Sequence, residues 1–216
     1  MFPPGVYALA DDTACPELTV LAQAEQLLKG GVRVLQLRLK RTPGAEAVAL
    51  IRLLTAEAHA ARAALVVNDR VDWALLAAAD GVHLGDEDLP VEEARRLLGP
   101  KALVGVTVRS ARAAQAAQAA GADYVGLGPI FSPRSKEVAA PLLGIAGLRE
   151  VVAQSPLPVV AIGGIGLPSI RAVARAGAYA AAVVSDVLGA KDIARRVRQL
   201  QEEFLRGVEE RGIPER

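Results

Sequence analysis

Aromatic residues are scarce in this sequence, and its two signs of charge nearly cancel. Phe, Trp and Tyr make up 3% of the 216 residues, and 25 Lys and Arg against 24 Asp and Glu leave a formal net charge of +1. Few aromatic side chains leave few platforms on which single-stranded bases can stack, and a balanced charge gives no basic field for a polyanion. We therefore expect no nucleic-acid partner.

Long apolar runs and cysteine pairs are also missing. No apolar run approaches the roughly 18 residues of a membrane span, and "MFPPGVYALA" at the start has neither the basic nor the uninterrupted apolar region of a secretory signal. These absences predict a cytoplasmic protein without a membrane partner. The single cysteine, Cys15, has no disulfide partner and no nearby histidine, so we interpret it as a surface thiol. The absence of a Ser/His/Asp order, a Cys pair and a Walker-type loop argues against hydrolase, zinc and P-loop functions.

Short runs rich in β-branched residues alternate with segments rich in Ala, Leu and Arg. With 52% hydrophobic residues, the chain has enough apolar surface for one sizeable core. The predicted strands are 6–10, 34–39, 65–69, 81–84, 103–108, 124–128, 158–163 and 180–185. The predicted helices between them include 17–29, 44–62, 91–98, 110–120, 146–154, 168–176 and 190–206. Such alternation predicts parallel strands joined by helical crossovers.

Eight predicted strands in a chain of this length indicate an α/β fold of the (β/α)₈ TIM-barrel type. A doubly wound sheet usually has fewer strands and a Gly-rich turn after the first one, and "ALADDTA" offers no such turn. No linker or change of composition divides the chain. Residues 1–216 are therefore predicted to form a single TIM-barrel domain.

Polar side chains recur at every second position where the second predicted strand ends. They are Gln36, Arg38 and Lys40 in "QLRLK". Because side chains alternate between the two faces of a strand, these three point to the barrel interior or mouth, and the leucines between them point to the helices. Cations placed there without an anion would be costly, and the C-terminal ends of barrel strands are where active sites lie. The pattern favours anion binding, with a buried ion pair as the alternative.

Amide and carboxylate side chains follow the next two strands. Asn68 and Asp69 end the third strand, and "HLGDEDLP" places Asp88 in the loop after the fourth. Carboxylates from two neighbouring loops, beside cations, describe a Mg²⁺ site that substrate phosphates and water would complete. Helix capping is the alternative, by Asp69 ahead of "RVDWALLAAA" and by Asp88 ahead of "LPVEEARRLL".

Two later segments suit a phosphate group. Glycines in "AIGGIG", 161–166, end the seventh predicted strand, and "VVSD" ends the eighth. In this fold the loops after these two strands commonly hold a phosphate. The long loop 129–144 places Lys136 among Pro and Ser residues, which is typical of a lid or binding loop; an ordinary surface lysine is the alternative.

We interpret His83 as a core histidine with its hydrogen bonds satisfied and His59 as solvent-facing.

Taken in order, several of these segments resemble the thiamine phosphate synthase family over nearly the whole chain. They are "QLRLK", "VVNDRVDWALLAAADGVHLGDEDLP", "GADYVGLGPIF", "SK" at 135–136, "PVVAIGGI" and "AAAVVS". The resemblance implies the TIM barrel and an Mg²⁺-dependent transferase. It would join 4-amino-2-methyl-5-hydroxymethylpyrimidine diphosphate to 4-methyl-5-(2-hydroxyethyl)thiazole phosphate, giving thiamine phosphate and pyrophosphate.

The same resemblance implies roles for individual residues. Arg38, Lys40 and Lys136 would be catalytic, because they would neutralise charge on the leaving diphosphate. Asp69 and Asp88 would hold Mg²⁺. The residues that would bind the two substrates are Gln36, Arg38, Lys40, Asn68, Thr107, Ser135, Lys136, Gly164, Val184 and Ser185, with Thr107 standing where the family commonly has a serine.

The loop before the lysine departs from the family pattern. Pro133, Arg134 and Ser135 stand where the family has Thr-x-Thr, so one hydroxyl toward the thiazole phosphate is missing. This departure keeps open a thiazole tautomerase of thiamine biosynthesis. A non-catalytic barrel that binds phosphate ligands is a further alternative. Another phosphate-binding barrel, such as a sugar-phosphate epimerase, would need acid and base partners at the strand ends, which the sequence does not offer. Against the tautomerase, the chain keeps the metal and diphosphate residues and has no histidine near Pro129. The sequence leaves open whether the chain forms a homo-oligomer.

Overall fold

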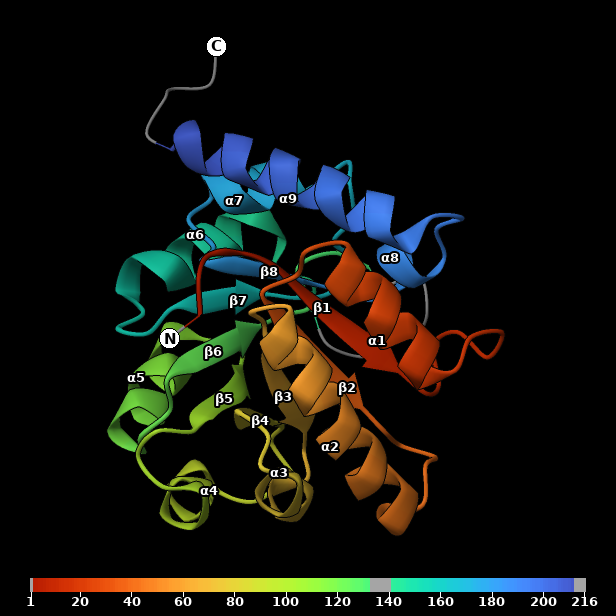
Figure 1. Cartoon of the computed structure of the whole chain (residues 1–216). Coiled ribbons are helices and arrows are strands. Elements are labelled where there is room, and N and C mark those ends of the chain that lie inside the picture. Colours follow the sequence, from red (N-terminus) through yellow and green to blue (C-terminus); the bar gives the residue numbers. More distant parts are fainter. Residues whose placement is uncertain (1, 133–140, 212–216) are drawn as a thin grey trace.

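Eight parallel strands close into a barrel in the order in which they follow along the chain (Figure 1). The structure is a computed structural model, and it describes residues 2–132 and 141–211. The strands are β1 (Gly5–Asp11), β2 (Val34–Arg38), β3 (Ala64–Asn68), β4 (Gly81–Leu84), β5 (Leu103–Val108), β6 (Tyr124–Leu127), β7 (Val159–Ala161) and β8 (Ala180–Val183). Because β1 pairs with both β2 and β8, the sheet has no free edge, and the predicted TIM barrel is confirmed.

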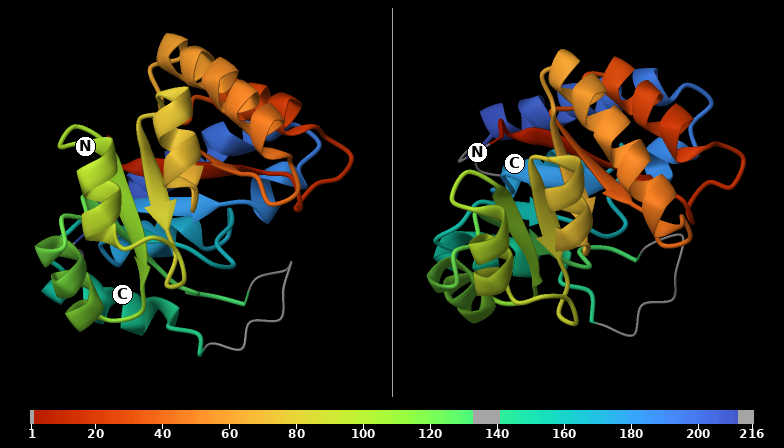
Figure 2. Two further views of the ribbon diagram at one scale, coloured as in Figure 1. Left: turned by 90° about the horizontal axis from the view of Figure 1, so that it is seen from below. Right: turned by 60° about the horizontal axis from the view of Figure 1, so that its bottom comes forward.

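Helices surround the barrel on its outside, as the two further views show (Figure 2). They are α1 (Val20–Lys29), α2 (Gly44–Ala60), α3 (Val71–Ala77), α4 (Val91–Leu98), α5 (Ala111–Ala119), α6 (Gly144–Gln154), α7 (Ile170–Arg175), α8 (Ser185–Leu188) and α9 (Ile193–Glu209). The short helix α8 was missed, because the predicted strand 180–185 ran on into it. Pairing of β8 with β1 stops at Val183, opposite Ala8, although Val184 continues the β-branched pattern.

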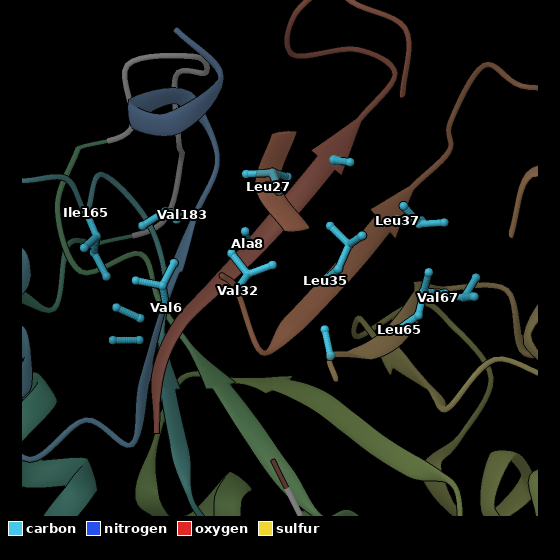
Figure 3. Packing of buried hydrophobic residues seen from close by; sticks show 14 of the residues in the cluster. Val6, Ala8, Leu27, Val32, Leu35, Leu37, Leu65, Val67, Ile165 and Val183 are labelled. Atoms are coloured by element: carbon cyan, nitrogen blue, oxygen red, sulfur yellow. The ribbon is translucent and has the colours of Figure 1, made fainter. Parts of the chain in front are cut away.

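Alternate residues of each strand pack on opposite sides of the barrel wall. In β1, Val6 and Ala8 belong to the apolar layer between strands and helices, whereas Tyr7 and Leu9 belong to a separate cluster inside the barrel. Figure 3 shows members of the outer layer, among them Leu35, Leu37, Leu65 and Val67. Each fully buried aliphatic side chain of this kind contributes roughly 1.5–3 kcal/mol. The outer layer therefore holds the helices against the barrel.

The second strand follows the same alternation and brings polar groups into the barrel. Leu35 and Leu37 lie in the outer layer, while Gln36 is 3% exposed and faces inward with Val34. This confirms the predicted orientation of "QLRLK" for its first two polar positions, since Arg38 lines the same interior pocket as Gln36.

Phe2 packs against three tyrosines of the barrel. Its ring makes edge contacts with Tyr7, Tyr124 and Tyr179 at centroid distances of 5.9, 5.3 and 5.6 Å. Phe2 belongs to the same interior cluster as Tyr7 and Tyr124 and is 4% exposed. It therefore helps to keep water away from these two tyrosines. Throughout the described residues, no helix has the length and apolar character needed to cross a membrane.

Candidate active site

Polar residues from four neighbouring strands meet at the carboxyl end of the barrel. Asp11 ends β1, Arg38 ends β2, Asn68 ends β3, and the loop that contains Asp88 follows β4. Because all strands are parallel, these ends share one rim, which is where barrels of this type place their chemistry.

Arg38 has a carboxylate partner that the sequence analysis did not identify. Its Nη1 lies 2.8 Å from Oδ2 of Asp11 and also donates to Oγ1 of Thr13 at 3.1 Å. The other oxygen of Asp11, Oδ1, accepts hydrogen bonds from the backbone N and the hydroxyl of Thr13, at 2.7 and 2.6 Å. The ion pair considered as the alternative is therefore present. A guanidinium group has five N–H donors, so Arg38 keeps donors for a ligand in the pocket that it lines.

Lys40 contacts Asp69 across the gap between the loops that follow β2 and β3. Its Nζ forms an ion pair with Oδ2 of Asp69. The backbone of Asp69 has a φ of +64° in the left-handed region, and its N–H donates to the carbonyl of His83 at 2.8 Å. Asp69 thus lies one residue beyond the end of β3, although the sequence placed it in the strand. This turn directs its carboxylate toward Lys40.

The carboxylates of Asp69 and Asp88 interact with each other. Burial raises the pKa of Asp69, contact with Lys40 lowers it, and the neighbouring Asp88 raises it further, so the net shift is upward. Oδ2 of Asp88 also accepts from the backbone N of Gly85 at 2.7 Å. Two acidic groups held this close destabilise each other's charged form, and a bound cation relieves that repulsion. The pair therefore suits a divalent cation.

Neither acidic residue caps a helix, which was the alternative reading of both. The residue at the N-cap of α3 is Arg70 and that of α4 is Pro90, and no side chain accepts a capping hydrogen bond at either. In the described ranges no group of three or more His, Cys, Asp or Glu side chains could hold a metal ion by itself. Two carboxylates nevertheless fit Mg²⁺, which is usually held by one or two of them together with phosphate oxygens and water.

A pocket lies inside the barrel and has a volume of about 150 Å³. Four of the predicted substrate-binding residues line it, namely Gln36, Arg38, Asn68 and Thr107. The complete lining is Tyr7, Leu9, Gln36, Arg38, Asn68, His83, Thr107, Tyr124, Gly126, Val160, Ile162 and Ala182. The pocket is thus polar on the side of β2 to β5 and apolar on the side of β7 and β8.

His83 lies in this pocket, and its ring nitrogens are hydrogen-bonded as the sequence analysis expected. Nδ1 lies 3.2 Å from the hydroxyl of Tyr124, and Nε2 lies 3.1 Å from Oγ1 of Thr107. Burial lowers the pKa of His83 to about 4, so the imidazole is neutral near pH 7. The interpretation as a core residue was incomplete, because the ring also lines the pocket.

A second pocket, of about 220 Å³, lies among the loops that follow β6, β7 and β8. Its lining is Phe131, Ser132, Gly164, Ile165, Gly166, Pro168, Ser169, Ser185 and Asp186. Gly164 has a φ of +63°, and a Cβ there would lie 2.6 Å from the carbonyl of Ser132. Of the residues predicted to bind the thiazole phosphate, Gly164 and Ser185 line the pocket. Val184, the N-cap of α8, directly precedes Ser185 in the chain.

Ser135 and Lys136 lie outside the described residues, as do Pro133 and Arg134. Their predicted roles therefore stay predictions.

The residues of the site that were missed include Tyr7, Asp11, Asp12 and Tyr124. In "ALADDTA", Asp11 ends the first strand and Asp12 follows it. The reasoning applied to the later strand ends would therefore have found both. Oδ1 of Asp12 accepts from the backbone N of Lys40 at 2.9 Å, and Oδ2 accepts from Arg41 and Thr42 at 2.8 and 2.9 Å. Asp12 therefore holds the loop that carries Lys40. No sequence signal marked the two tyrosines as polar partners inside a barrel.

Comparison with known proteins decides the family. The model of a family described as thiamine monophosphate synthase matches residues 6–187. The chain belongs to this family. It is 58% identical to a thiamine-phosphate synthase of Myxococcus xanthus over 95% of this chain and 94% of that protein. Identity to the thiamine-phosphate synthase of Anaeromyxobacter dehalogenans is 53%, over 89% and 86% of the two chains.

Solved structures agree with this membership. A thiamine phosphate pyrophosphorylase from Pyrococcus furiosus superimposes with a TM-score of 0.85 at 34% identity, over 94% of this chain and 96% of that one. A 3-hexulose-6-phosphate synthase, with a TM-score of 0.68 at 21% identity, shares the fold alone. Membership of the thiamine monophosphate synthase family confirms the resemblance found in the sequence. It also confirms the predicted class of activity, a transferase of thiamine biosynthesis that releases diphosphate.

Proposed function

We propose that this protein condenses 4-amino-2-methyl-5-hydroxymethylpyrimidine diphosphate with 4-methyl-5-(2-hydroxyethyl)thiazole phosphate, giving thiamine phosphate and pyrophosphate. The observation that carries the proposal is the arrangement at the barrel mouth. Arg38 lines the interior pocket together with Gln36 and Asn68. In the loop that follows the same strand, Lys40 forms an ion pair with Asp69, whose carboxylate also interacts with that of Asp88. The interior pocket thus lies beside the cations and carboxylates that would stabilise a departing diphosphate.

The interior pocket would take the pyrimidine, with its diphosphate toward the rim. Gln36, Asn68 and Thr107 offer amide and hydroxyl groups to a polar ring. Arg38 and Lys40 would neutralise the charge that develops on the diphosphate as its bond to the pyrimidine methylene breaks. Lys136 is assigned the same role on the sequence resemblance.

The second pocket would hold the thiazole phosphate. Gly164 lets the backbone approach an anion without a side chain in the way, and Ser185 supplies a hydroxyl. Val184 and Ser135 complete the predicted set. Because an electron-rich aminopyrimidine stabilises a cation at its methylene, attack by the thiazole nitrogen needs little help from a base. Holding both substrates in line then contributes much of the rate.

Asp69 and Asp88 would hold Mg²⁺. Their mutual repulsion and their position beside Lys40 fit a cation that shares its coordination with phosphate oxygens. Bound Mg²⁺ would supply charge stabilisation to the leaving diphosphate. Lys40 would then be released from Asp69 toward the diphosphate.

The direct test is incubation of the purified protein with the pyrimidine diphosphate, the thiazole phosphate and Mg²⁺. We expect thiamine phosphate and pyrophosphate in equal amounts, and no product when EDTA is added. Isomerisation of a thiazole carboxylate phosphate in EDTA would instead support the tautomerase. Binding of the substrates without turnover would support the non-catalytic barrel.

Three further expectations form part of this proposal. They are a cytoplasmic location, a single domain over residues 1–216, and small-molecule substrates as the partners, with homo-oligomerisation left open.

A further inference from the structure

Five side chains form a continuous series of hydrogen bonds through the interior of the barrel. Nε2 of Gln36 lies 2.8 Å from the hydroxyl of Tyr7, which lies 2.9 Å from the hydroxyl of Tyr124. The series continues from Tyr124 to Nδ1 of His83 and from Nε2 of His83 to the hydroxyl of Thr107, at 3.2 and 3.1 Å. Its two ends, Gln36 and Thr107, are predicted substrate-binding residues. The three residues between them have no assigned role.

The amide end of the series determines the direction of every other hydrogen bond. The Nε2 group of Gln36 can only donate, so the oxygen of Tyr7 accepts. Among the described residues, the only acceptor for the hydroxyl proton of Tyr7 is then Tyr124. Tyr124 in turn has Nδ1 of His83 as its acceptor. A neutral imidazole that accepts at Nδ1 carries its proton on Nε2, and this proton is donated to Thr107.

The surroundings hold the rings of this series in place and keep the two tyrosines dry. A Cβ at Gly105 would lie 2.1 Å from the ring of Tyr124, and one at Gly126 would lie 2.9 Å from the ring of His83. The two rings therefore occupy space that other side chains would fill, and they stack with a centroid distance of 5.6 Å. Tyr7 and Tyr124 are each at most 2% exposed. In such surroundings an unpaired hydroxyl costs about 1–3 kcal/mol, so a reversed or broken series is disfavoured.

Charge states agree with a neutral series. Burial raises the pKa of the phenol groups of both Tyr7 and Tyr124, and burial lowers that of His83 to about 4. Near pH 7 no member is ionised, so each hydrogen bond has one defined donor and one defined acceptor.

We propose that Tyr7, Tyr124 and His83 are positioning residues that make Thr107 a hydrogen-bond donor and the Gln36 carboxamide oxygen an acceptor toward the pyrimidine. The proposal rests on the function proposed above. With its own oxygen accepting from His83, the Thr107 hydroxyl has its proton free for the pocket. With Nε2 engaged by Tyr7, Gln36 has no donor to its Oε1 among the described residues.

This polarity selects a particular kind of ring. The ligand must present an N–H donor toward Gln36 and a lone pair toward Thr107. An aminopyrimidine has both, because its exocyclic amino group donates and its ring nitrogens accept. A ring in which a carbonyl oxygen replaces the amino group would place two acceptors against each other at Gln36 and would be rejected.

The first test measures the tautomer of His83 directly. The chain contains two histidines, so ¹⁵N-histidine labelling gives two imidazole spin systems, and the His59→Gln variant assigns them. His59 is exposed, and the hydrogen bonds of its ring are to Asp80, which is not a member of the series. At pH 7 we expect His83 to show an unprotonated Nδ1 and a protonated Nε2. A protonated Nδ1 would reverse the hydrogen bonds from Tyr7 through to Thr107 and overturn the proposal.

The second test breaks the series in its middle. Tyr124→Phe removes a hydroxyl without changing the ring, so His83 loses the partner that determines its tautomer. We expect mixed tautomers in the spectrum and a roughly tenfold higher KM for the pyrimidine diphosphate, with the KM for the thiazole phosphate unchanged. Tyr7→Phe should act in the same direction, and it serves if Tyr124→Phe does not fold.

Tyr179→Phe is the matched control. Its hydroxyl donates to the carbonyl of Phe2 and touches no member of the series, so neither the tautomer nor the KM for the pyrimidine diphosphate should change. An unchanged His83 spectrum and KM in both Tyr124→Phe and Tyr7→Phe would contradict the positioning role. If the wild-type protein makes no thiamine phosphate, the proposed function fails, while the tautomer still reports on the series.

Discussion

Nη1 of Arg38 lies 2.8 Å from Oδ2 of Asp11, so the cation at the end of β2 has a carboxylate partner within the chain. Asp11 is 5% exposed and is hydrogen-bonded to Thr13 through its second oxygen. The pair removes the cost of placing an uncompensated cation at the barrel mouth, and it fixes the direction from which the guanidinium meets a ligand. A fixed guanidinium loses less conformational entropy when it binds a phosphate.

Asp11→Asn tests this orienting role. The amide keeps the shape of the side chain but removes the charge opposite Arg38, and one of its two former acceptor atoms becomes a donor. We expect a loss of about 1–3 kcal/mol in the free energy of unfolding and a higher KM for the pyrimidine diphosphate. Urea unfolding and steady-state kinetics measure the two effects. An unchanged KM would mean that Asp11 serves stability alone.

Asp12→Asn tests the residue that holds the Lys40 loop, through the pH dependence of stability. Burial raises the pKa of Asp12, but hydrogen bonds from Lys40, Arg41 and Thr42 outweigh it, and the pKa is below the usual 3.8. A lowered pKa in the folded state gives stability that is complete above the unfolded value and is lost as the pH falls through the folded one. Wild type should therefore exceed Asp12→Asn in stability at pH 7, and the gap should close in strong acid. Chemical unfolding at several pH values measures it, and a gap that widens on acidification would be contrary to expectation.

Asp69→Asn and Asp88→Asn test the proposed Mg²⁺ site. Asparagine tolerates the left-handed backbone of Asp69, so the first change should remove a metal ligand without straining the turn. We expect either variant to lose more than about 100-fold in pyrophosphate release and to lose Mg²⁺ binding, measured by calorimetry with pyrophosphate present. Asp86→Asn, at an exposed position of the same loop, is the control and should behave as wild type. Wild-type turnover in both variants would refute the metal assignment.

Gly164→Ala tests the second pocket. The added Cβ would lie 2.6 Å from the carbonyl of Ser132, at a φ of +63° that costs alanine about 1–2 kcal/mol. The KM for the thiazole phosphate should rise roughly tenfold while the KM for the pyrimidine diphosphate stays the same. In the control, Gly44→Ala, the Cβ lies in ordinary contact with Trp73 at 3.7 Å, and both constants should be unchanged. An equal rise of both constants in Gly164→Ala would show that the pocket is not specific to one substrate.

Local pattern was sufficient for the barrel and for the polar residues that follow or end its second, third and fourth strands. Period-two alternation in "VLQLR" separated Leu35 and Leu37 from Gln36, because neighbouring side chains of a strand must point to opposite faces. Asp69 and Asp88, which lie in the loops after two neighbouring strands, were predicted to meet, because parallel strands bring their carboxyl ends to one rim.

Pairing between side chains that are distant in sequence was decided by the tertiary structure alone. Asp11 and Arg38 are 27 residues apart, and Tyr7 and Tyr124 are 117 apart. Whether such groups meet depends on the register of the strands and on the space that Gly105 leaves for the Tyr124 ring. By itself the sequence determined which chemical groups the barrel has at its mouth. Closure of the barrel decided which of them are neighbours, since hydrogen bonds and ion pairs act only over a few ångströms.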